Sequence, residues 1–377
     1  MRKIRIENFK TIGALEAEIS PTTLLIGPPS SGKSNFMEAI ALAGYFNRLL
    51  LLKEEYDNNV SYLEDIKGIL RFSEPSHLFR FHDIAGKKIK ISISNGPSQD
   101  VELFYEKGNL KLKINDVLIP WNLLSAPSNL NNLTAALNNA LEKSPLIESR
   151  LYGFDRYGLT EKIYSYMKNM HTSDAPKAIL SEHAKNLPRI IRGFLTIIDE
   201  INEVFSLQET QFELKLLRSG ALVLFDYNSE VDPILASDAV GRTLYYILAL
   251  KSSATYAKLH GLENKMVICL EEPEAHVFPY FFDLFIEKIV EVSKIIDVIV
   301  TTHNPLFASL LCDKVKDIEA YYVYRDRRGS TKMVKISMEK LAEEYATIAD
   351  LSRASPSEIV ERFSTPPKEV SSSAASH

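Results

Sequence analysis

Hydrophobic and polar positions alternate at the start of the chain with the period of β-strands. Apolar residues alternate with charged ones at residues 4–7 and again at 15–19, on either side of a short turn. Residues 23–26 are mostly apolar and predict a buried third strand. After it, apolar residues recur at helical spacing to about residue 52. The pattern therefore predicts two half-buried strands, a buried strand and a long helix.

The middle of the chain changes from a strand pattern to a helix pattern. Short alternating segments at residues 88–93, 101–105 and 110–114 predict an antiparallel β subdomain. Helical spacing dominates farther on, and residues 178–205 predict a helix that Pro188 breaks or kinks. No a/d heptad is sustained over several repeats, which argues against a long coiled-coil arm.

The last third contains two apolar runs joined by a helix. Residues 266–270 and 295–300 predict buried strands, and the segment between them has its aromatic residues on one helical face. A strand, a helix and a strand of this length predict a parallel crossover, with the two strand ends side by side. A hairpin over residues 321–336 and a helix over 338–351 complete the predicted elements.

Composition narrows the class of protein. The 377 residues are 45% hydrophobic and 25% charged, as in ordinary globular proteins. The net charge of -5 provides no general attraction to nucleic acid, so DNA binding would need a local basic patch. Cys269 and Cys312 have no metal-type spacing. Without a secretory or membrane-spanning pattern, we expect a cytoplasmic protein that contacts no membrane.

The residues between the third strand and the long helix carry the first chemical signal. They fit the phosphate-binding pattern G-x-x-x-x-G-K-[ST] over residues 27–34. A turn that contains Lys-Ser by chance is the alternative, and the flanking strand and helix disfavour it. Lys33 is expected to reach the β- and γ-phosphates of ATP, and Ser34 to place its hydroxyl on Mg²⁺. The predicted nucleotide-binding residues of this segment are Gly27, Ser30, Ser31, Gly32, Lys33, Ser34 and Asn35.

The ends of the two later strands carry the second signal. Glu271 and Glu272 follow the first apolar run, and His303 follows the second. A solvated strand end and a surface imidazole are the alternatives for these residues. Next to a phosphate loop, Glu271 suits the metal shell, and Glu272 suits a general base whose basicity its acidic neighbour raises. His303 is expected beside them as a second catalytic residue.

Together these segments resemble the ABC-type ATPases of the RecF, SMC and OLD group, which are also catalogued as AAA-family ATPases. The resemblance rests on Arg5-Ile6-Glu7-Asn8-Phe9-Lys10, Gly32-Lys33-Ser34-Asn35, Leu270-Glu271-Glu272-Pro273-Glu274-Ala275-His276 and Thr301-Thr302-His303-Asn304-Pro305. It implies an α/β fold, a P-loop NTPase head of ABC type with an antiparallel β subdomain and a helical lobe. With the patterns above, the predicted regions are an ATPase core (1–53 and 232–350), the β subdomain (54–125), the helical lobe (126–231) and a tail (353–377) whose prolines and serines predict disorder.

The resemblance also implies an ATP site that a second copy completes. Ala236-Ser237-Asp238-Ala239-Val240-Gly241-Arg242 is similar to the signature segment of the family, so Ser237 would contact the γ-phosphate of the partner's ATP. Ala239 stands where the signature glycine is expected, and no convincing Q-loop glutamine is visible. We therefore expect slow or partner-dependent hydrolysis. The segment Asp155-Arg156-Tyr157-Gly158 is also similar to a recurrent family segment, without an assigned role.

Three functions compete at this stage. The first is an ATPase that dimerises on binding ATP and Mg²⁺ and acts in DNA repair, DNA maintenance or phage defence. DNA and a separate nuclease or effector chain are its candidate partners, since the residues after His303 show no acidic nuclease cluster. The second is a nucleotide-bound regulatory or scaffold protein that scarcely hydrolyses ATP. The third, a P-loop kinase or GTPase, is disfavoured: no guanine-reading motif is present, and a Glu-Glu pair followed by a strand-end histidine is not typical of a kinase.

Overall fold

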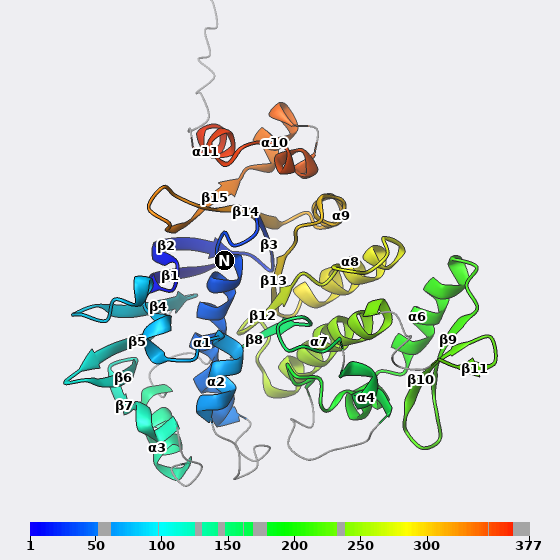
Figure 1. Cartoon of the computed structure of the whole chain (residues 1–377), viewed down its shortest axis with the longest axis horizontal. Coiled ribbons are helices and arrows are strands. Elements are labelled where there is room, and N and C mark those ends of the chain that lie inside the picture. The colour runs from blue at the N-terminus through cyan, green and yellow to red at the C-terminus, as the bar shows by residue number, and fades with distance from the viewer. Residues whose placement is uncertain are drawn as a thin grey trace, which may run out of the picture.

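The computed structural model describes residues 1–51, 62–96, 98–124, 130–141, 148–160, 162–168, 179–231, 238–345 and 347–364. Figure 1 shows an antiparallel sheet on one side, a second sheet at the centre, and a group of helices on the other side. The segment Ala236–Ser237, with most of the preceding loop, lies outside the described residues. The predicted α/β fold class is confirmed.

The antiparallel sheet begins at the N-terminus of the chain. Its strand order is β2-β1-β4-β5-β6-β7, and the bounds are β1 (Arg2–Phe9), β2 (Ile12–Ile19), β4 (Lys88–Ser94), β5 (Ser98–Glu106), β6 (Asn109–Ile114) and β7 (Val117–Pro120). Alternate residues of β1 are buried, as the sequence pattern predicts. Because β1 pairs with β4, this sheet extends across the boundary that we predicted at residue 53.

The central sheet holds the apolar strands. Its order is β15-β14-β3-β13-β12-β8, with β3 (Thr22–Ile26), β8 (Glu148–Gly153), β12 (Met266–Glu271), β13 (Asp297–Thr301), β14 (Ile318–Arg325) and β15 (Thr331–Ile336). All neighbours are parallel except β15, which pairs antiparallel with β14. Strand β8 lies inside the region that we predicted to be a helical lobe. That boundary was wrong, since residues 148–153 belong to the central sheet.

Helix α1 (Lys33–Leu51) fills the space between the two sheets. One continuous core joins the inner face of the antiparallel sheet, α1 and one face of the central sheet, represented by Ile6, Phe36 and Cys269. The other face of the central sheet packs on α7 (Asp238–His260) and α8 (Tyr280–Ser293). This layering places the N-terminus of α1 at the carboxyl edge of the central sheet, where open α/β folds bind ligands.

Smaller elements surround these layers. The helices are α2 (Tyr62–Leu70), α3 (Leu130–Leu141), α4 (Ile163–Lys168), α5 (Leu187–Ile190) and α6 (Thr196–Leu207), and a small sheet is formed by β9 (Phe212–Leu216), β10 (Leu222–Asp226) and β11 (Ser229–Glu230). In the described part of residues 178–205, the predicted helix is divided into α5 and α6. Pro188 instead lies in the first turn of α5, where proline fits because no hydrogen bond needs its missing N–H.

The last elements of the chain lie around β14 and β15, in the upper part of Figure 1. They are α9 (Pro305–Lys314), α10 (Met338–Glu344) and α11 (Pro356–Ser364). The predicted disordered tail from residue 353 is corrected by α11. Ser355 and Glu358 hydrogen-bond each other's backbone N–H at its start, and Ile359 is fully buried. Residues 365–377 lie outside the described residues.

Candidate nucleotide site

The phosphate loop joins β3 to α1, and its two glycines are required by close backbone contacts. Gly27 has φ +143°, and a Cβ there would lie 2.1 Å from the carbonyl oxygen of Val323. Gly32 has φ +107°, and a Cβ would lie 2.0 Å from Oγ1 of Thr331. Both φ values favour glycine. The loop is thus pressed against β14 and β15, and these strands keep it curled around the N-terminus of α1.

Hydrogen bonds fix the loop further. The Thr331 hydroxyl donates to the carbonyl oxygen of Ser31 at 3.0 Å. The side-chain amide of Asn35 donates to Oγ1 of Thr11 at 2.6 Å, which ties α1 to the turn between β1 and β2. The loop and the first turn of α1 line a cavity of ≈ 380 Å³, together with Arg71, Glu272, Thr301, His303 and Arg325. A helix N-terminus that opens into a cavity with four basic side chains suits a polyphosphate.

Lys33 is buried at the floor of this cavity. Its ammonium group donates to the carbonyl oxygens of Gly27 at 2.9 Å and Pro28 at 3.0 Å. Burial lowers the pKa of Lys33 to about 8, although the charges of Glu272 and Glu271 act to raise it. The lysine is therefore held close to the place where phosphate oxygens would lie, and in the described part of the chain its direct partners are neutral hydrogen-bond acceptors.

Glu271 is the last residue of β12 and faces the start of α1. The Ser34 hydroxyl donates to its Oε1, so the two predicted metal ligands are in contact. Arg156 donates to both carboxylate oxygens, from Nε to Oε2 at 2.8 Å and from Nη2 to Oε1 at 3.1 Å. Burial acts to raise the pKa of Glu271, but the Arg156 guanidinium and its hydrogen bonds hold this pKa below its usual value. Glu271 is thus poised as a carboxylate.

Glu272 and His303 form the predicted pair at the adjacent strand ends. Nε2 of His303 lies 3.2 Å from Oε1 of Glu272. Glu272 has φ +47°, a left-handed conformation that its N–H stabilises by donating to the carbonyl oxygen of Thr301 at 3.1 Å. The pKa of Glu272 lies below its usual value because of the hydrogen bond from His303 and the nearby Lys33 charge. Glu271 acts to raise this pKa, as we expected, but the hydrogen bond from His303 and the Lys33 charge outweigh it.

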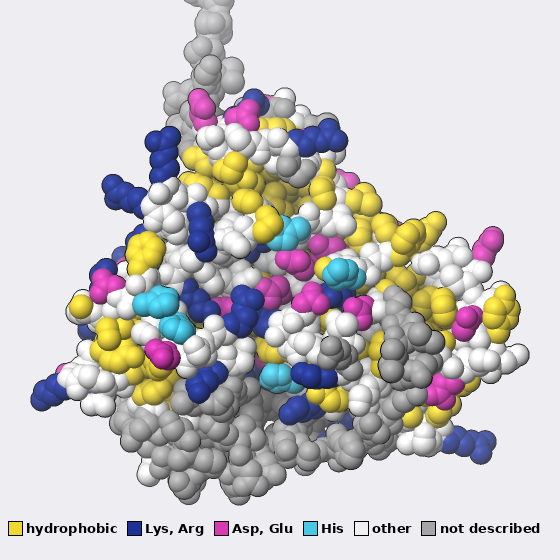
Figure 2. Space-filling model, viewed as in Figure 1, with side chains coloured by type: hydrophobic (Ala, Val, Ile, Leu, Met, Phe, Trp, Pro, Cys, Tyr) yellow, Lys and Arg dark blue, Asp and Glu magenta, His cyan; other side chains and the backbone are white. Residues whose placement is uncertain are grey.

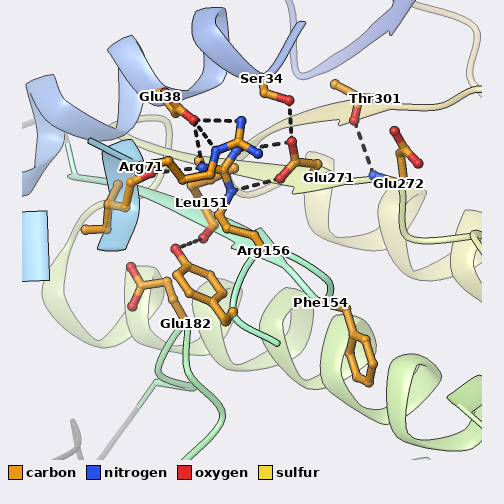
Figure 3. A network of polar contacts seen from close by, with 12 residues as sticks. Ser34, Glu38, Arg71, Leu151, Phe154, Arg156, Glu182, Glu271, Glu272 and Thr301 are labelled. Carbon is orange, nitrogen blue, oxygen red and sulfur yellow. Dashed lines mark hydrogen bonds and ion pairs between the residues drawn. The ribbon is translucent and has the colours of Figure 1, made fainter. Parts of the chain in front are cut away.

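Figure 2 shows acidic side chains gathered in the middle of one face, with histidines beside them and lysines and arginines to their left. The close view in Figure 3 places Arg156 between Glu38 of α1 and Glu271 of β12. Its Nη1 donates to Oε1 of Glu38 at 2.7 Å. Lys10 and Arg71 also contact Glu38, which is fully buried. Three cations and two carboxylates therefore form one network under the phosphate loop.

Sequence reasoning did not assign a role to Arg156 or Arg71. The sequence analysis did single out the segment Asp155–Gly158, which contains Arg156. A role for Arg156 could be assigned only with the knowledge that the residues before it form strand β8. Parallel pairing places Gly153 of β8 beside Glu271 of β12, so the next turn of chain reaches the acidic site. Arg71 follows α2 as an isolated basic residue, and nothing in its local pattern marks it.

The donor set fits Mg²⁺. Among the described residues no group of three or more His, Cys, Asp or Glu could hold a metal ion by itself. Ser34 and Glu271 offer one hydroxyl and one carboxylate in contact at the mouth of a phosphate loop. Mg²⁺ commonly takes one or two protein oxygens and completes its shell with phosphate oxygens and waters. The two side chains would hold the metal in this way.

The signature segment is only partly described. Ser237 lies outside the described residues, so its predicted contact with a second copy stays a prediction. Asp238 and Ala239 begin α7. Arg242, one turn later, is buried and donates to Oδ1 of Asp155 at 2.6 Å. The segment that carries Arg156 is therefore attached to the helix that follows the signature.

Comparison with known proteins agrees with this geometry. A family model described as "AAA domain, putative AbiEii toxin, Type IV TA system" matches residues 22–309, which include the phosphate loop and both later strand ends. The chain belongs to this AAA family. A sequence comparison with curated proteins finds no match.

Among the solved structures that are similar to this chain, one reaches a TM-score that supports a common fold. An SMC head bound to the C-winged helix domain of ScpA matches this AAA protein with a TM-score of 0.50 and 17% identity, over 90% of this chain and 98% of that chain. An SMC head domain from Thermotoga maritima matches with a TM-score of 0.43, 14% identity and coverages of 89% and 98%. An SMC head from Pyrococcus furiosus bound to a ScpA domain gives 0.46, 17%, 91% and 98%.

The predicted membership of the AAA group is thereby confirmed, and the fold is similar to that of an SMC head. The family and the fold are those of ATPases and imply nucleotide binding. Within the described part of this AAA protein, no helix combines the length and the apolar character needed to cross a membrane.

Proposed function

We propose that this AAA protein binds ATP with Mg²⁺ and hydrolyses it in the cavity between the phosphate loop and the ends of β12 and β13. The observation that carries the proposal is the convergence of Lys33, Glu272 and His303 on one cavity. These residues come from three elements far apart in the sequence. A purely structural role gives no reason to bring a buried lysine, a strained glutamate and a histidine to one opening.

Binding would begin at the phosphate loop. The N–H groups at the start of α1 and the Lys33 ammonium would contact the β- and γ-phosphates, and the positive end of the helix dipole favours the same anion. Lys33 would exchange its carbonyl acceptors for phosphate oxygens, which are charged and bind it more strongly. Ser34 and Glu271 would hold Mg²⁺, which supplies Lewis-acid neutralisation of the phosphate charge.

Hydrolysis would use Glu272 as the general base. The carboxylate would accept a proton from a water whose oxygen attacks the γ-phosphorus, while the bond to the β-phosphate oxygen breaks and ADP leaves. His303 would hold Glu272 in place through the 3.2 Å contact. Because the pKa of Glu272 is below its usual value, the base is ionised at neutral pH but weak, which favours slow turnover.

Two heads would sandwich the nucleotide. In this arrangement, Ser237 of a second copy contacts the γ-phosphate that Lys33 holds, so ATP joins the copies and its hydrolysis separates them. This extends the sequence resemblance and the SMC-head fold to the proposed homodimer. The SMC heads in the comparison bind ScpA domains, which supports a further partner chain here, such as a nuclease or effector.

For the pathway, we propose a role in phage defence or in DNA repair and maintenance. The family description names a toxin of a toxin–antitoxin system, which supports the defence role. Basic residues of the middle region that could contact DNA are distributed over separate elements. Lys88 and Lys90 lie on β4 near Glu102, whereas Arg189 and Arg192 belong to the helical part. We keep DNA as a candidate partner, with these residues as its candidate contacts.

A nucleotide-bound regulatory protein with little hydrolysis is the second candidate. Two observations favour it: Arg156 already occupies both oxygens of Glu271, and Ala239 stands at the signature glycine position. Both would hinder assembly of a catalytically competent site. The two candidates share the nucleotide site and differ only in turnover.

Phosphate release under saturating Mg-ATP tests the proposal. We expect slow but measurable turnover by the wild-type protein, with and without added duplex DNA, and a loss of at least about a hundredfold in Glu272→Gln. Glu291→Gln changes an exposed glutamate of α8 in the same way and serves as the matched control. ATP binding without turnover in the wild type would favour the regulatory protein, and absence of ATP binding would reject both candidates.

A further inference from the structure

Arg156 is positioned on Glu271 by the pairing of two strands. Gly153, the last residue of β8, lies beside Glu271 in the parallel register. A Cβ on Gly153 would lie 2.9 Å from Oε2 of Glu271 and 3.0 Å from Cβ of Arg156. The absence of a side chain at Gly153 therefore gives the fully buried Arg156 side chain the space to reach the Glu271 carboxylate.

The hydrogen bonds from Arg156 leave few acceptor positions on the Glu271 carboxylate for a second cation. Both carboxylate oxygens accept from Arg156, and Oε1 also accepts from Ser34. A divalent metal that bound Glu271, directly or through a water, would take one of these positions. It would also face the guanidinium charge at close range in a site that solvent screens poorly. Arg156 and a metal ion thus compete for Glu271.

Glu38 is a second carboxylate partner for Arg156. This carboxylate lies one helical turn after Ser34 on α1, and its side chain is completely buried. It accepts from Nη1 of Arg156, while Lys10 and Arg71 hold it from other sides. Nη1 also donates to the carbonyl oxygen of Ile69 at 2.9 Å. If Arg156 gave up Glu271, it would keep a carboxylate and a carbonyl as partners.

We propose that Arg156 is the resident cation of the metal site: it neutralises Glu271 in the nucleotide-free head and yields Glu271 to Mg²⁺ while it stays bound to Glu38. The inference rests on the proposed function, because that function makes Glu271 a metal ligand. It deepens that function by naming the residue that sets how much Mg²⁺ the site needs. Arg156 is a positioning residue in this role, since it acts through Glu271.

Metal binding can be measured without turnover. Mn²⁺ serves as the probe because free and bound Mn²⁺ differ in their electron paramagnetic resonance signal, and the non-hydrolysable AMP-PNP supplies the phosphates. We expect Arg156→Met to lower the Mn²⁺ concentration for half-saturation by about tenfold, the order expected for removing one charge-assisted contact. We expect Glu38→Gln to raise it severalfold, because Arg156 then has only Glu271 as a carboxylate partner.

A double variant separates this exchange from a general effect of charge. If Glu38 acts through Arg156, Glu38→Gln has no further effect on Mn²⁺ binding in the Arg156→Met background. If the two substitutions add independently, Glu38 acts only through its own charge, and the exchange is rejected. Arg156→Lys keeps the charge but loses the two-pronged contact. It should shift the Mn²⁺ midpoint in the same direction as Arg156→Met, by less.

The outcomes distinguish this inference from the function on which it rests. An unchanged or weaker Mn²⁺ affinity in both Arg156 variants, with AMP-PNP still bound, would overturn the exchange and make Arg156 a residue that orients Glu271 for the metal. A wild-type protein that binds no AMP-PNP would reject the proposed function itself. Circular dichroism of each variant checks the fold, and Arg156→Lys carries the test if Arg156→Met does not fold.

Discussion

At the scale of single residues, Glu274 is an acid in an environment poorly suited to a negative charge. Its side chain is almost completely buried, Oε1 accepts from the Thr302 hydroxyl, and Oε2 has no hydrogen-bond partner in the described structure. Burial raises the pKa of Glu274 to about 7. Through its contact with Thr302, Glu274 joins the end of β12 to the loop that carries His303. Under mildly acidic conditions its carboxyl group is neutral.

This raised pKa predicts a pH dependence of stability. Between about pH 4.5 and 7 the unfolded chain releases the Glu274 proton while the folded protein keeps it. The free energy of unfolding should therefore fall as the pH rises through this window, by up to about 1.4 kcal/mol per pH unit from this group. Urea unfolding of wild type and Glu274→Gln at several pH values tests it, with exposed Glu287→Gln as control. Wild-type and Glu274→Gln stabilities that stay parallel across the window would contradict the prediction.

Lys33 supports a second prediction at the scale of one residue. Its direct partners in the described structure are loop oxygens, so its removal should leave the fold intact. Lys33→Ala should weaken ATP binding by about a hundredfold or more, because a charge-assisted contact to phosphate is lost. Isothermal titration measures the affinity, and Lys265→Ala, at an exposed lysine, is the control. Equal ATP affinity in wild type and Lys33→Ala would exclude the phosphate loop as the binding site.

Among elements, the packing of α1 on β8 determines how closely the phosphate-loop helix approaches the central sheet. A Cβ on Gly44 of α1 would lie 2.0 Å from Oγ of Ser149 and 2.3 Å from its backbone nitrogen. The Ser149 hydroxyl donates to the carbonyl oxygen of Ile40 at 2.6 Å across the same contact. The helix and the strand thus touch through their backbones, and no side chain larger than hydrogen fits between them at this point.

Two helical glycines provide a matched test of this contact. Gly44→Ala should destabilise the protein by about 1–3 kcal/mol, because the added methyl group forces α1 away from β8. The free energy lost in this way exceeds the free energy that alanine gains from its higher helix propensity. Gly68→Ala in α2 meets only ordinary contacts, the nearest at 3.8 Å to His183. It should leave stability unchanged or raise it by up to about 1 kcal/mol. Thermal unfolding compares the two, and equal shifts in melting temperature would count against the backbone contact.

The same elements show what the sequence could and could not predict. The phosphate loop, β12 and β13 are marked by local patterns, and the structure brings their predicted residues together. Strand β8 was missed because its first three residues, Glu148, Ser149 and Arg150, are polar yet buried. Arg150 pairs with Glu148 at 2.9 Å and with Glu182 at 3.4 Å, and these partners make the burial tolerable. A strand that begins with buried ion-paired residues has no hydrophobic pattern at its start, so β8 and the Arg156 segment that follows it were both missed.

For the whole molecule, the composite ATP site predicts a nucleotide-dependent oligomer. Glu272→Gln keeps the shape of the side chain but loses the base, so it should accumulate as a dimer with Mg-ATP and stay monomeric without nucleotide. Adding Ser237→Arg should abolish that dimer by bulk and charge. Light scattering gives the mass of each variant with and without Mg-ATP. A Glu272→Gln protein that binds ATP but remains a monomer would reject the shared site and leave nucleotide binding intact.

The pairing of β3 also has a consequence for how the protein forms during synthesis. The strand that leads into the phosphate loop is made early, at Thr22–Ile26, but its two neighbours in the sheet are Asp297–Thr301 and Ile318–Arg325. Thr331, which hydrogen-bonds to Ser31 and packs against Gly32 of the phosphate loop, is synthesised after both neighbouring strands. Contacts between such distant segments form slowly, because a long loop must close first. A chain that ends before Thr331, nascent or truncated, therefore has no finished nucleotide site, and ATP can stabilise only a polypeptide translated at least through β15.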